Sequence, residues 1–103
     1  MKNNTMALND KDLQIIKAFI PKLNMLKICI KKAEINDVID KLIMDCQYLT
    51  VSPNSNVYDI DKKINNLLDD CRIEAMKNVP NEQKIEEFVL QIRVKFEERK
   101  IYL

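Results

Sequence analysis

The chain has 103 residues, 47% of them hydrophobic and 32% charged, with a formal net charge of +1; this indicates one folded domain and excludes a disordered or strongly charged chain. It contains no glycine, which argues against a sheet-rich fold and excludes the glycine-rich phosphate loops of nucleotide-binding proteins. It also contains no histidine, which excludes Ser-His-Asp and Cys-His catalysis and most zinc sites, so we expect an all-α protein that is not an enzyme and binds no cofactor or metal.

The first predicted helix begins at Asn9, after an N-terminal lead (residues 1–8) that we expect to be flexible. One apolar face recurs at steps of three and four residues: Ile16, Phe19, Leu23, Leu26 and Ile30. Pro21 interrupts this stretch, so either the helix kinks there or two helices meet, with Pro21 in the first turn of the second. Because the apolar face keeps its phase, we predict one helix that is kinked at Pro21.

Two further helices are predicted in the middle of the chain. Asn36 is expected to cap the first of them, whose apolar face is Ile35, Ile39, Leu42, Cys46 and Leu49. The turn-forming segment "TVSPNSN" separates it from the next helix, which Asn56 is expected to cap. The apolar face of that helix is Val57, Ile60, Ile64, Leu67 and Cys71. A short hairpin over residues 48–58, resembling a wing beside the helices, stays open as an alternative.

The last predicted helix starts at or just before Asn81, after the break at "NVPNEQ". Its apolar face is Ile85, Phe88, Val89, Ile92 and Phe96, and the chain ends in the apolar tail "KIYL". Four amphipathic helices with short connections predict a small antiparallel bundle, with residues 9–103 as a single helical domain.

Charge is segregated along the chain. Residues 11–33 hold six lysines and one acid, whereas residues 34–70 hold eight acids and three lysines, so we expect the first helix to pack beside the next two. In a DNA-binding reading, a lysine-rich surface would contain Lys17, Lys27, Lys31 and Lys32. These lysines surround the helix instead of gathering on one side, and no arginine accompanies them, which favours a solvated surface.

The other charged clusters have the spacing of exposed helix faces. Glu97 and Glu98 are spaced for intrahelical ion pairs with the bases around them, which are Arg93, Lys95, Arg99 and Lys100. We predict that these ion pairs are exposed to solvent. The three cysteines, Cys29, Cys46 and Cys71, have no C-x-x-C spacing and lie on or beside apolar faces. We interpret them as buried free thiols that act as small apolar side chains.

Methionine and tyrosine suit adaptable contact surfaces, and the candidate partner-binding residues are Met25, Met44, Tyr48, Tyr58 and Tyr102. We therefore expect a non-catalytic helical module of the inhibitor, immunity, adaptor or chaperone type, which binds another protein or a second copy of itself. A DNA-binding regulator and a structural or assembly subunit of a larger particle are the alternatives.

Two further expectations concern the source and the compartment. Lysines outnumber arginines by 14 to 3, which is typical of an AT-rich genome of a bacterium, phage or DNA virus. Reduced thiols, no signal peptide and no apolar run of about twenty residues favour a cytoplasmic, intracellular protein.

Overall fold

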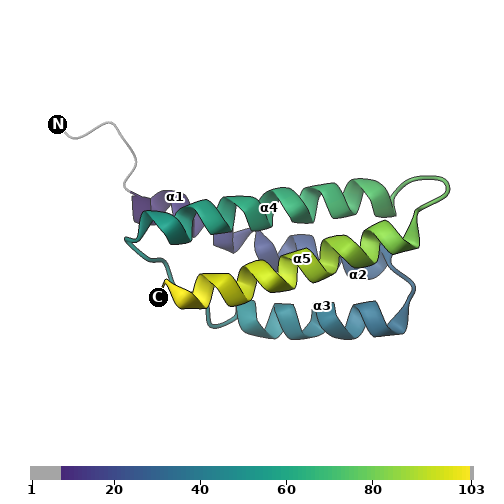
Figure 1. Ribbon diagram of the computed structural model, residues 1–103, viewed down its shortest axis with the longest axis horizontal. Helices are drawn as coiled ribbons and strands as arrows, with labels where there is room; N and C mark the ends of the chain where they lie inside the picture. The colour runs from purple at the N-terminus through teal and green to yellow at the C-terminus, as the bar shows by residue number, and fades with distance from the viewer. Residues whose placement is uncertain (1–7, 103) are drawn as a thin grey trace.

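In the computed structural model, residues 8–102 form five α-helices and, within that range, no β-strand (Figure 1). The helices are α1 (Leu8–Lys17), α2 (Phe19–Cys29), α3 (Ala33–Cys46), α4 (Ser55–Ala75) and α5 (Glu82–Ile101). α1 and α2 follow each other directly and together make one bent member of a four-helix bundle. The prediction of an all-α bundle of about four helices is confirmed. The predicted N-terminal lead lies outside the described residues, except for Leu8, with which α1 begins one residue before the expected cap.

The bend in the first member lies at Ala18, so the prediction of a kink at Pro21 was wrong in position. The reason is the geometry of proline. A helical residue at position 21 would donate its N–H to the carbonyl of Lys17, but proline has no N–H and its ring crowds that carbonyl. The hydrogen-bond ladder therefore breaks one turn before Pro21, which lies in the first turn of α2.

Two asparagines cap the long helices of the second half of the chain. The side chain of Asn54 accepts a hydrogen bond from the backbone N–H of Asn56 (2.9 Å) at the start of α4. The cap is therefore Asn54, two residues before the predicted one. Asn81 caps α5 as predicted, because its side chain accepts from the backbone N–H of Lys84 (3.1 Å).

Asn36 has a different role from the one predicted. α3 begins at Ala33, so Asn36 lies inside its first turn. Its Nδ2 donates to the carbonyl oxygen of Ile30, 2.9 Å away, at the end of α2. Asn36 thus ties the end of one helix to the start of the next instead of capping its own.

The connection between α3 and α4 is a loop and not a wing. Residues 48–58 contain no strand; they comprise a turn at the end of α3, an irregular segment and the first residues of α4. The Ser52 hydroxyl accepts a hydrogen bond from the backbone N–H of Asn54 (3.1 Å). None of the described residues has a positive φ, so the glycine-free chain makes each of these connections in backbone regions open to any residue.

The carboxylate of Glu74, near the end of α4, binds the connection between α4 and α5. Glu74 Oε2 accepts from the backbone N–H of Asn81 (3.0 Å), and Glu74 Oε1 accepts from Lys77 Nζ (3.0 Å). These two hydrogen bonds, the one from Asn81 above all, lower the pKa of Glu74. The link that reverses the chain between the two longest helices is therefore tied to the end of α4.

The four members of the bundle form two hairpins. α2 turns back into α3 and α4 turns back into α5, while α2 packs beside α4 and α3 packs beside α5 (Figure 1). α3 and α4 lie on opposite sides of the bundle, so the loop between them crosses its end. In the view of Figure 1, α5 lies in front of α3 and α4, and α2 lies behind them.

The core lies along the axis of the bundle, where every member contributes apolar side chains. Phe19 of α2 and Phe96 of α5 meet edge to face with ring centroids 5.7 Å apart, and both are buried. The other fully buried apolar side chains include Leu23, Leu26, Ile39, Ile64, Leu68, Val89 and Ile92. Of the neighbouring leucines of α4, Leu68 is buried and Leu67, which we had placed on the face, is only half-buried. None of the described helices is long and apolar enough to cross a bilayer.

Phe19→Ala should lower the free energy of unfolding by about 3–5 kcal/mol, because it leaves a cavity beside Phe96 at the centre of the core. Chemical denaturation followed by circular dichroism measures the loss. Phe88 on α5 is only half-buried, and Phe88→Ala is the matched control with a smaller loss. Equal losses for the two variants would contradict the placement of the core.

Candidate functional site

Three charged side chains are buried at the end of the bundle where α5 finishes. Arg99 of α5 is 1% exposed, and Asp12 of α1 and Asp61 of α4 are fully buried. The prediction that Arg99 belongs to an exposed intrahelical network was wrong. The physical reason is its position: Arg99 follows Phe96 by one turn on the same face of α5, so its side chain points into the bundle.

The guanidinium of Arg99 joins four parts of the chain. Its Nε donates to Asp61 Oδ1 (2.8 Å), and its Nη2 donates to the carbonyl oxygen of Thr50 (2.8 Å) in the loop after α3. The same Nη2 lies 3.8 Å from Asp12 Oδ2. This buried charge cluster (Asp12, Asp61 and Arg99) therefore holds α1, α4, α5 and the α3–α4 loop together.

The cluster holds two carboxyl groups for one cation. Both oxygens of Asp12 and Asp61 Oδ2 are buried and have no hydrogen-bond donor among the described residues. Two carboxylate oxygens can bond to each other only when one of them carries a proton. Burial first, and then a hydrogen bond with Asp12, raise the pKa of Asp61 to about 7, although Arg99 acts in the opposite direction. The raised pKa favours the protonated form of Asp61 below neutral pH, and that form can donate a hydrogen bond to Asp12.

The sequence contains a signal for this cluster that the analysis of charge runs missed. Each of the three residues continues an apolar face at a helical step. Asp12 precedes Ile16 and Phe19 at steps of four and three, Asp61 falls between Val57 and Ile64, and Arg99 follows Ile92 and Phe96. A charged residue in phase with a core stripe is buried unless the helix ends first. Two acids and one base placed in this way predict a buried ion pair.

The cluster links helices within the bundle, and the carboxyl groups of Asp12 and Asp61 are fully buried. A cavity of about 200 Å³ lies beside Arg99, with Tyr48, Leu49, Phe96 and Lys100 among its lining residues. Burial raises the pKa of the nearby Cys46 thiol to about 12, which disfavours the reactive thiolate form.

The interpretation of the cysteines is borne out for two of the three. Cys46 and Cys71 are buried free thiols, and burial raises the pKa of Cys71 to about 12 as well. Cys29 is free and half-buried, beside a cavity of about 310 Å³ between the two hairpin turns. Lys31 and Lys32 line the same cavity together with Pro80.

The structure separates the predicted partner-binding residues. Met44 is exposed in the last turn of α3, Tyr48 is exposed in the turn that follows α3, and Met25 is exposed on α2. Tyr58 is half-buried at the start of α4, with Lys62 Nζ 4.7 Å from its ring centroid. Tyr102 is exposed at the end of α5, and its carbonyl oxygen accepts from Asn54 Nδ2 (3.2 Å). The end of α3, the start of α4 and the end of α5 lie at the same end of the bundle (Figure 1), and each has one of the three tyrosines on it or next to it, whereas Met25 belongs to α2.

The lysines of the nucleic-acid reading lie on three segments, and of the four only Lys31 and Lys32 line a common cavity among those described. Lys27 forms an ion pair with Asp40 of α3, and Lys32 lies 3.3 Å from Glu86 of α5. Lys17 and Lys31 are exposed on different segments, at the end of α1 and in the turn after α2.

The expected packing of the basic first member beside the acidic helices is confirmed. Lys27 reaches Asp40 of α3, and Lys22 lies 2.9 Å from Asp69 of α4. Since these ion pairs are part-exposed, each contributes only about 0–1 kcal/mol.

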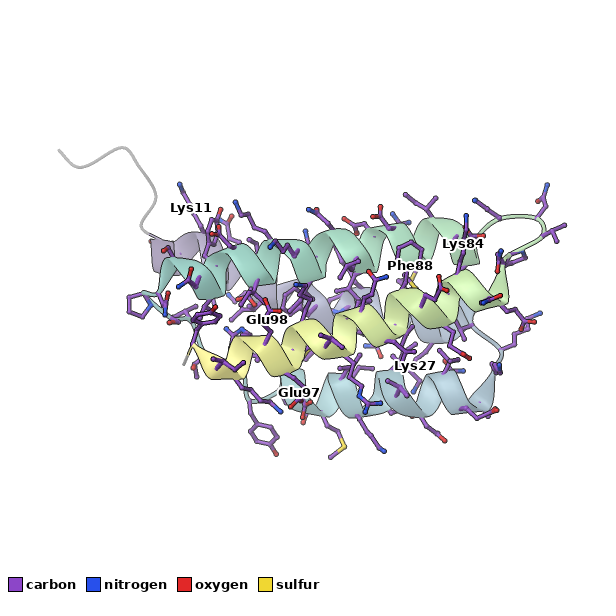
Figure 2. All side chains as sticks on the ribbon, viewed as in Figure 1. Lys11, Lys27, Lys84, Phe88, Glu97 and Glu98 are labelled. Carbon is purple, nitrogen blue, oxygen red and sulfur yellow. The ribbon has the colours of Figure 1, made fainter. Side chains whose placement is uncertain are left out.

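The outer face of α5 carries apolar side chains that the sequence analysis did not select. Leu90, Val94 and Ile101, which we call the outer α5 stripe, are 47%, 60% and 76% exposed. They lie on the side of α5 opposite its buried residues, so this helix is apolar on two faces. Figure 2 shows Glu97 and Glu98 leaving α5 on opposite sides, toward α3 and toward α4. The spacing 90, 94, 101 is the signal that could have found it.

The described residues contain no group of three or more Cys, Asp or Glu side chains arranged to hold a metal ion. No protein-family model, curated protein or solved structure matches this chain. Its function is therefore inferred from its surface and its buried groups.

Asp61→Asn should remove a pH dependence of stability, because the amide imitates the protonated acid and can donate to Asp12. The pKa of Asp61 is about 7 in the folded protein against 3.8 for the ordinary group, so the folded state favours the proton. The stability of the wild type relative to Asp61→Asn should fall as the pH rises from about 4 to about 7, by at most about 4 kcal/mol. Urea denaturation at several pH values measures this difference. Asp59→Asn, an exposed change on the same helix, should show no such trend; a flat difference for Asp61→Asn would contradict a raised pKa of Asp61.

Arg99→Met should destabilise the protein by about 3–5 kcal/mol at neutral pH, because it leaves two buried carboxyl groups without a cation. The loss should be smaller near pH 4.5, because the raised pKa of Asp61 favours its neutral form there, and a neutral acid needs no cation. Thermal denaturation at the two pH values tests this. Arg93→Met, at an exposed position of the same helix, is the control and should change stability by no more than about 0.5 kcal/mol. A pH-independent loss for Arg99→Met would argue against the cluster as its cause.

Proposed function

We propose that this protein is a non-catalytic helical interaction module that binds another protein molecule through the outer face of α5. The observation that carries the proposal is the outer α5 stripe, in which three large apolar side chains remain exposed at helical spacing on a ridge of the bundle. Single exposed apolar residues are ordinary, but a row on one helix marks a contact surface.

The core of the bundle forms without the outer α5 stripe, and this supports a binding role for the stripe. Val89, Ile92 and Phe96 already bury the inner face of α5 against the other helices. The stripe is therefore not needed for folding within one chain. A solvent-exposed helix face free of such a role usually carries charged and polar residues, so valine and leucine there point to a partner.

The distribution of the lysines favours protein binding over nucleic-acid binding. The lysines that a DNA-binding surface would use are divided among different segments, and two of the four have acidic neighbours, Asp40 and Glu86. Phosphate contacts need cations that gather on one face. A net charge of +1 adds no long-range attraction.

An assembly subunit that docks through its C-terminal tail would use part of the same surface, the outer α5 stripe. Lys100 and Ile101 are the last residues of α5, and Ile101 belongs to the outer stripe. A contact through "KIYL" would thus be one end of a contact along α5.

Val94→Glu should abolish partner binding while leaving stability within about 0.5 kcal/mol of the wild type, because Val94 is exposed and glutamate favours a helix. The measurement is affinity capture from a lysate of the source cells, followed by mass spectrometry. The matched control is Ile28→Glu, since Ile28 is 75% exposed on α2, on the opposite side of the bundle. The proposal predicts a protein that is retained by the wild type and by Ile28→Glu and lost with Val94→Glu. Equal capture by all three variants would speak against the outer stripe.

A separate measurement tests nucleic-acid binding. Duplex DNA titrated at low and moderate salt should give no salt-dependent binding at micromolar protein. Gln in place of Lys27, Lys31 and Lys32 should leave capture of the protein partner unchanged. A salt-sensitive DNA complex that this triple variant loses would replace the proposal with the nucleic-acid reading.

A further inference from the structure

The buried charge cluster holds α1 by a contact that needs a proton. Arg99 Nε donates to Asp61 Oδ1 at 2.8 Å, whereas Asp12 Oδ2 lies 3.8 Å from Arg99 Nη2. Both oxygens of Asp12 are buried, and no N–H of the described residues donates to them. The neighbour that can donate is Asp61, through an acid O–H that exists only while this side chain is protonated. Of the two acids, the one on α1 therefore depends on the proton.

α1 has few other anchors in the bundle. It packs on α2 and α4, and its buried side chains among the described residues are Asp12 and Ile16. α2, by contrast, has three buried apolar side chains of its own. The bend at Ala18 separates the two helices, because Pro21 has no N–H to continue the hydrogen-bond ladder. α1 can therefore move about this bend as a unit while α2 keeps its place in the core.

The charge of the cluster depends on this one proton. Asp12 of α1 and Arg99 of α5 face Asp61, and the guanidinium stays charged at every pH of interest. Cys46 of α3 lies near them, but burial raises the pKa of its thiol to about 12, so it stays neutral. The charged residues on the adjoining turns are exposed or paired with one another: Asp10, Lys11 and Lys17 on α1, Lys22 on α2 with Asp69 on α4, Asp45 on α3, Asp59, Lys62 and Lys63 on α4, and Lys95, Glu97, Glu98 and Lys100 on α5. Figure 2 shows Lys11 pointing outward from α1.

The direction of the pH effect follows from burial. Burial raises the pKa of Asp61 to about 7, against 3.8 for the ordinary group, although Arg99 acts in the opposite direction. Release of α1 would open Asp61 to water and remove Asp12, so the released state holds the proton less firmly than the docked state. Docking is therefore strongest in mild acid, weakens as the pH rises between these two pKa values, and changes little above about pH 7.

We propose that the proton on Asp61 controls the docking of α1: its acid O–H holds Asp12 and keeps α1 on α4, and its loss leaves two buried carboxylates for one guanidinium, so that α1 moves out at the Ala18 bend. The helices α2 to α5 keep their core in the released state, because the paired rings of Phe19 and Phe96 belong to them. The inference goes beyond the proposed function and does not involve the outer α5 stripe.

Native-state hydrogen exchange of the purified protein between pH 5 and pH 8 tests this control. Protection factors are compared, since they remove the direct effect of pH on the chemistry of exchange. Those of residues 12–17 should be lower than those in the middle of α5, and they should fall by roughly ten- to a hundredfold between pH 5 and pH 8. Low urea should leave exchange in α1 unchanged while it speeds exchange in α5, because undocking of one short helix exposes little surface.

Three variants connect the result to the cluster. Asp61→Asn carries an amide that can donate to Asp12 at every pH, so α1 should keep its protection from pH 5 to pH 8. Asp12→Asn leaves one acid for one cation, so its fall in protection should be smaller than that of the wild type; this variant also serves if Asp61→Asn does not fold. Asp59→Asn removes one exposed carboxylate from the same helix as Asp61 and should show the wild-type fall.

Any of three results overturns the inference. The first is that α1 shares the protection factors and the urea dependence of α5 at each pH, which means that α1 leaves only when the whole bundle unfolds. The second is a wild-type protection of α1 that stays constant or rises between pH 5 and pH 8. The third is an Asp61→Asn variant that keeps the wild-type fall, which assigns the pH dependence to another group. Capture of a partner through Val94 is a separate measurement, so the proposed function stands or fails independently of these results.

Discussion

The end of the bundle depends on one buried guanidinium. Arg99 is the only cation in contact with the two buried carboxyl groups of Asp12 and Asp61 among the described residues, and it also bonds the carbonyl oxygen of Thr50. Asp12 is one of two buried side chains of α1, together with Ile16, so its ion pair with Arg99 is one of the links between α1 and the rest of the bundle. The loop that crosses the bundle depends on the same group, because Thr50 lies within it. A single side chain near the C-terminal end of the described residues thereby fixes the N-terminal helix and the central loop.

α5 serves two environments at once. Its inner face contributes Phe96 and Val89 to the core and Arg99 to the charge cluster, while its outer face presents Leu90 and Val94 to solvent. When all residues of α5 are considered together, the helix has little amphipathic character, because apolar residues occur on both of its sides. The inner pattern alone explains the fold of one chain, and the outer pattern is what remains for a partner.

Much of the fold follows from the spacing of apolar residues, and the deviations have local causes. The steps from Ile16 to Ile30 and from Ile85 to Phe96 identify core faces correctly, because burial of apolar area dominates the choice of face. The position of the bend was missed because proline acts on the carbonyl four residues before it, and the caps shifted because any of several asparagines could begin a helix. Such boundaries depend on which side chain reaches a free N–H, and this requires the three-dimensional path of the loop.

The functional residues were harder to predict, for a physical reason. A run such as "RVKFEERK" reads as a solvated face when its charges are counted together, yet the residue in phase with Phe96 points inward and its neighbours point outward. Phase along the helix, and not charge density, separates Arg99 from Arg93. The exposed methionines and tyrosines were chosen by residue type, and the bundle distributes them over different helices.

The loop that crosses the end of the bundle also bears on how the chain reaches its native state. Each hairpin, α1–α3 and α4–α5, is closed by a turn of few residues, so most contacts within it join positions close together along the chain. The two hairpins meet through the packing of α1 and α2 on α4 and of α3 on α5. We expect rapid formation of each half, because local contacts need little loop-closure entropy, followed by a slower docking step that brings both halves together. The ionic contacts at Arg99, which unite residues from the first and last helices, belong to that final step.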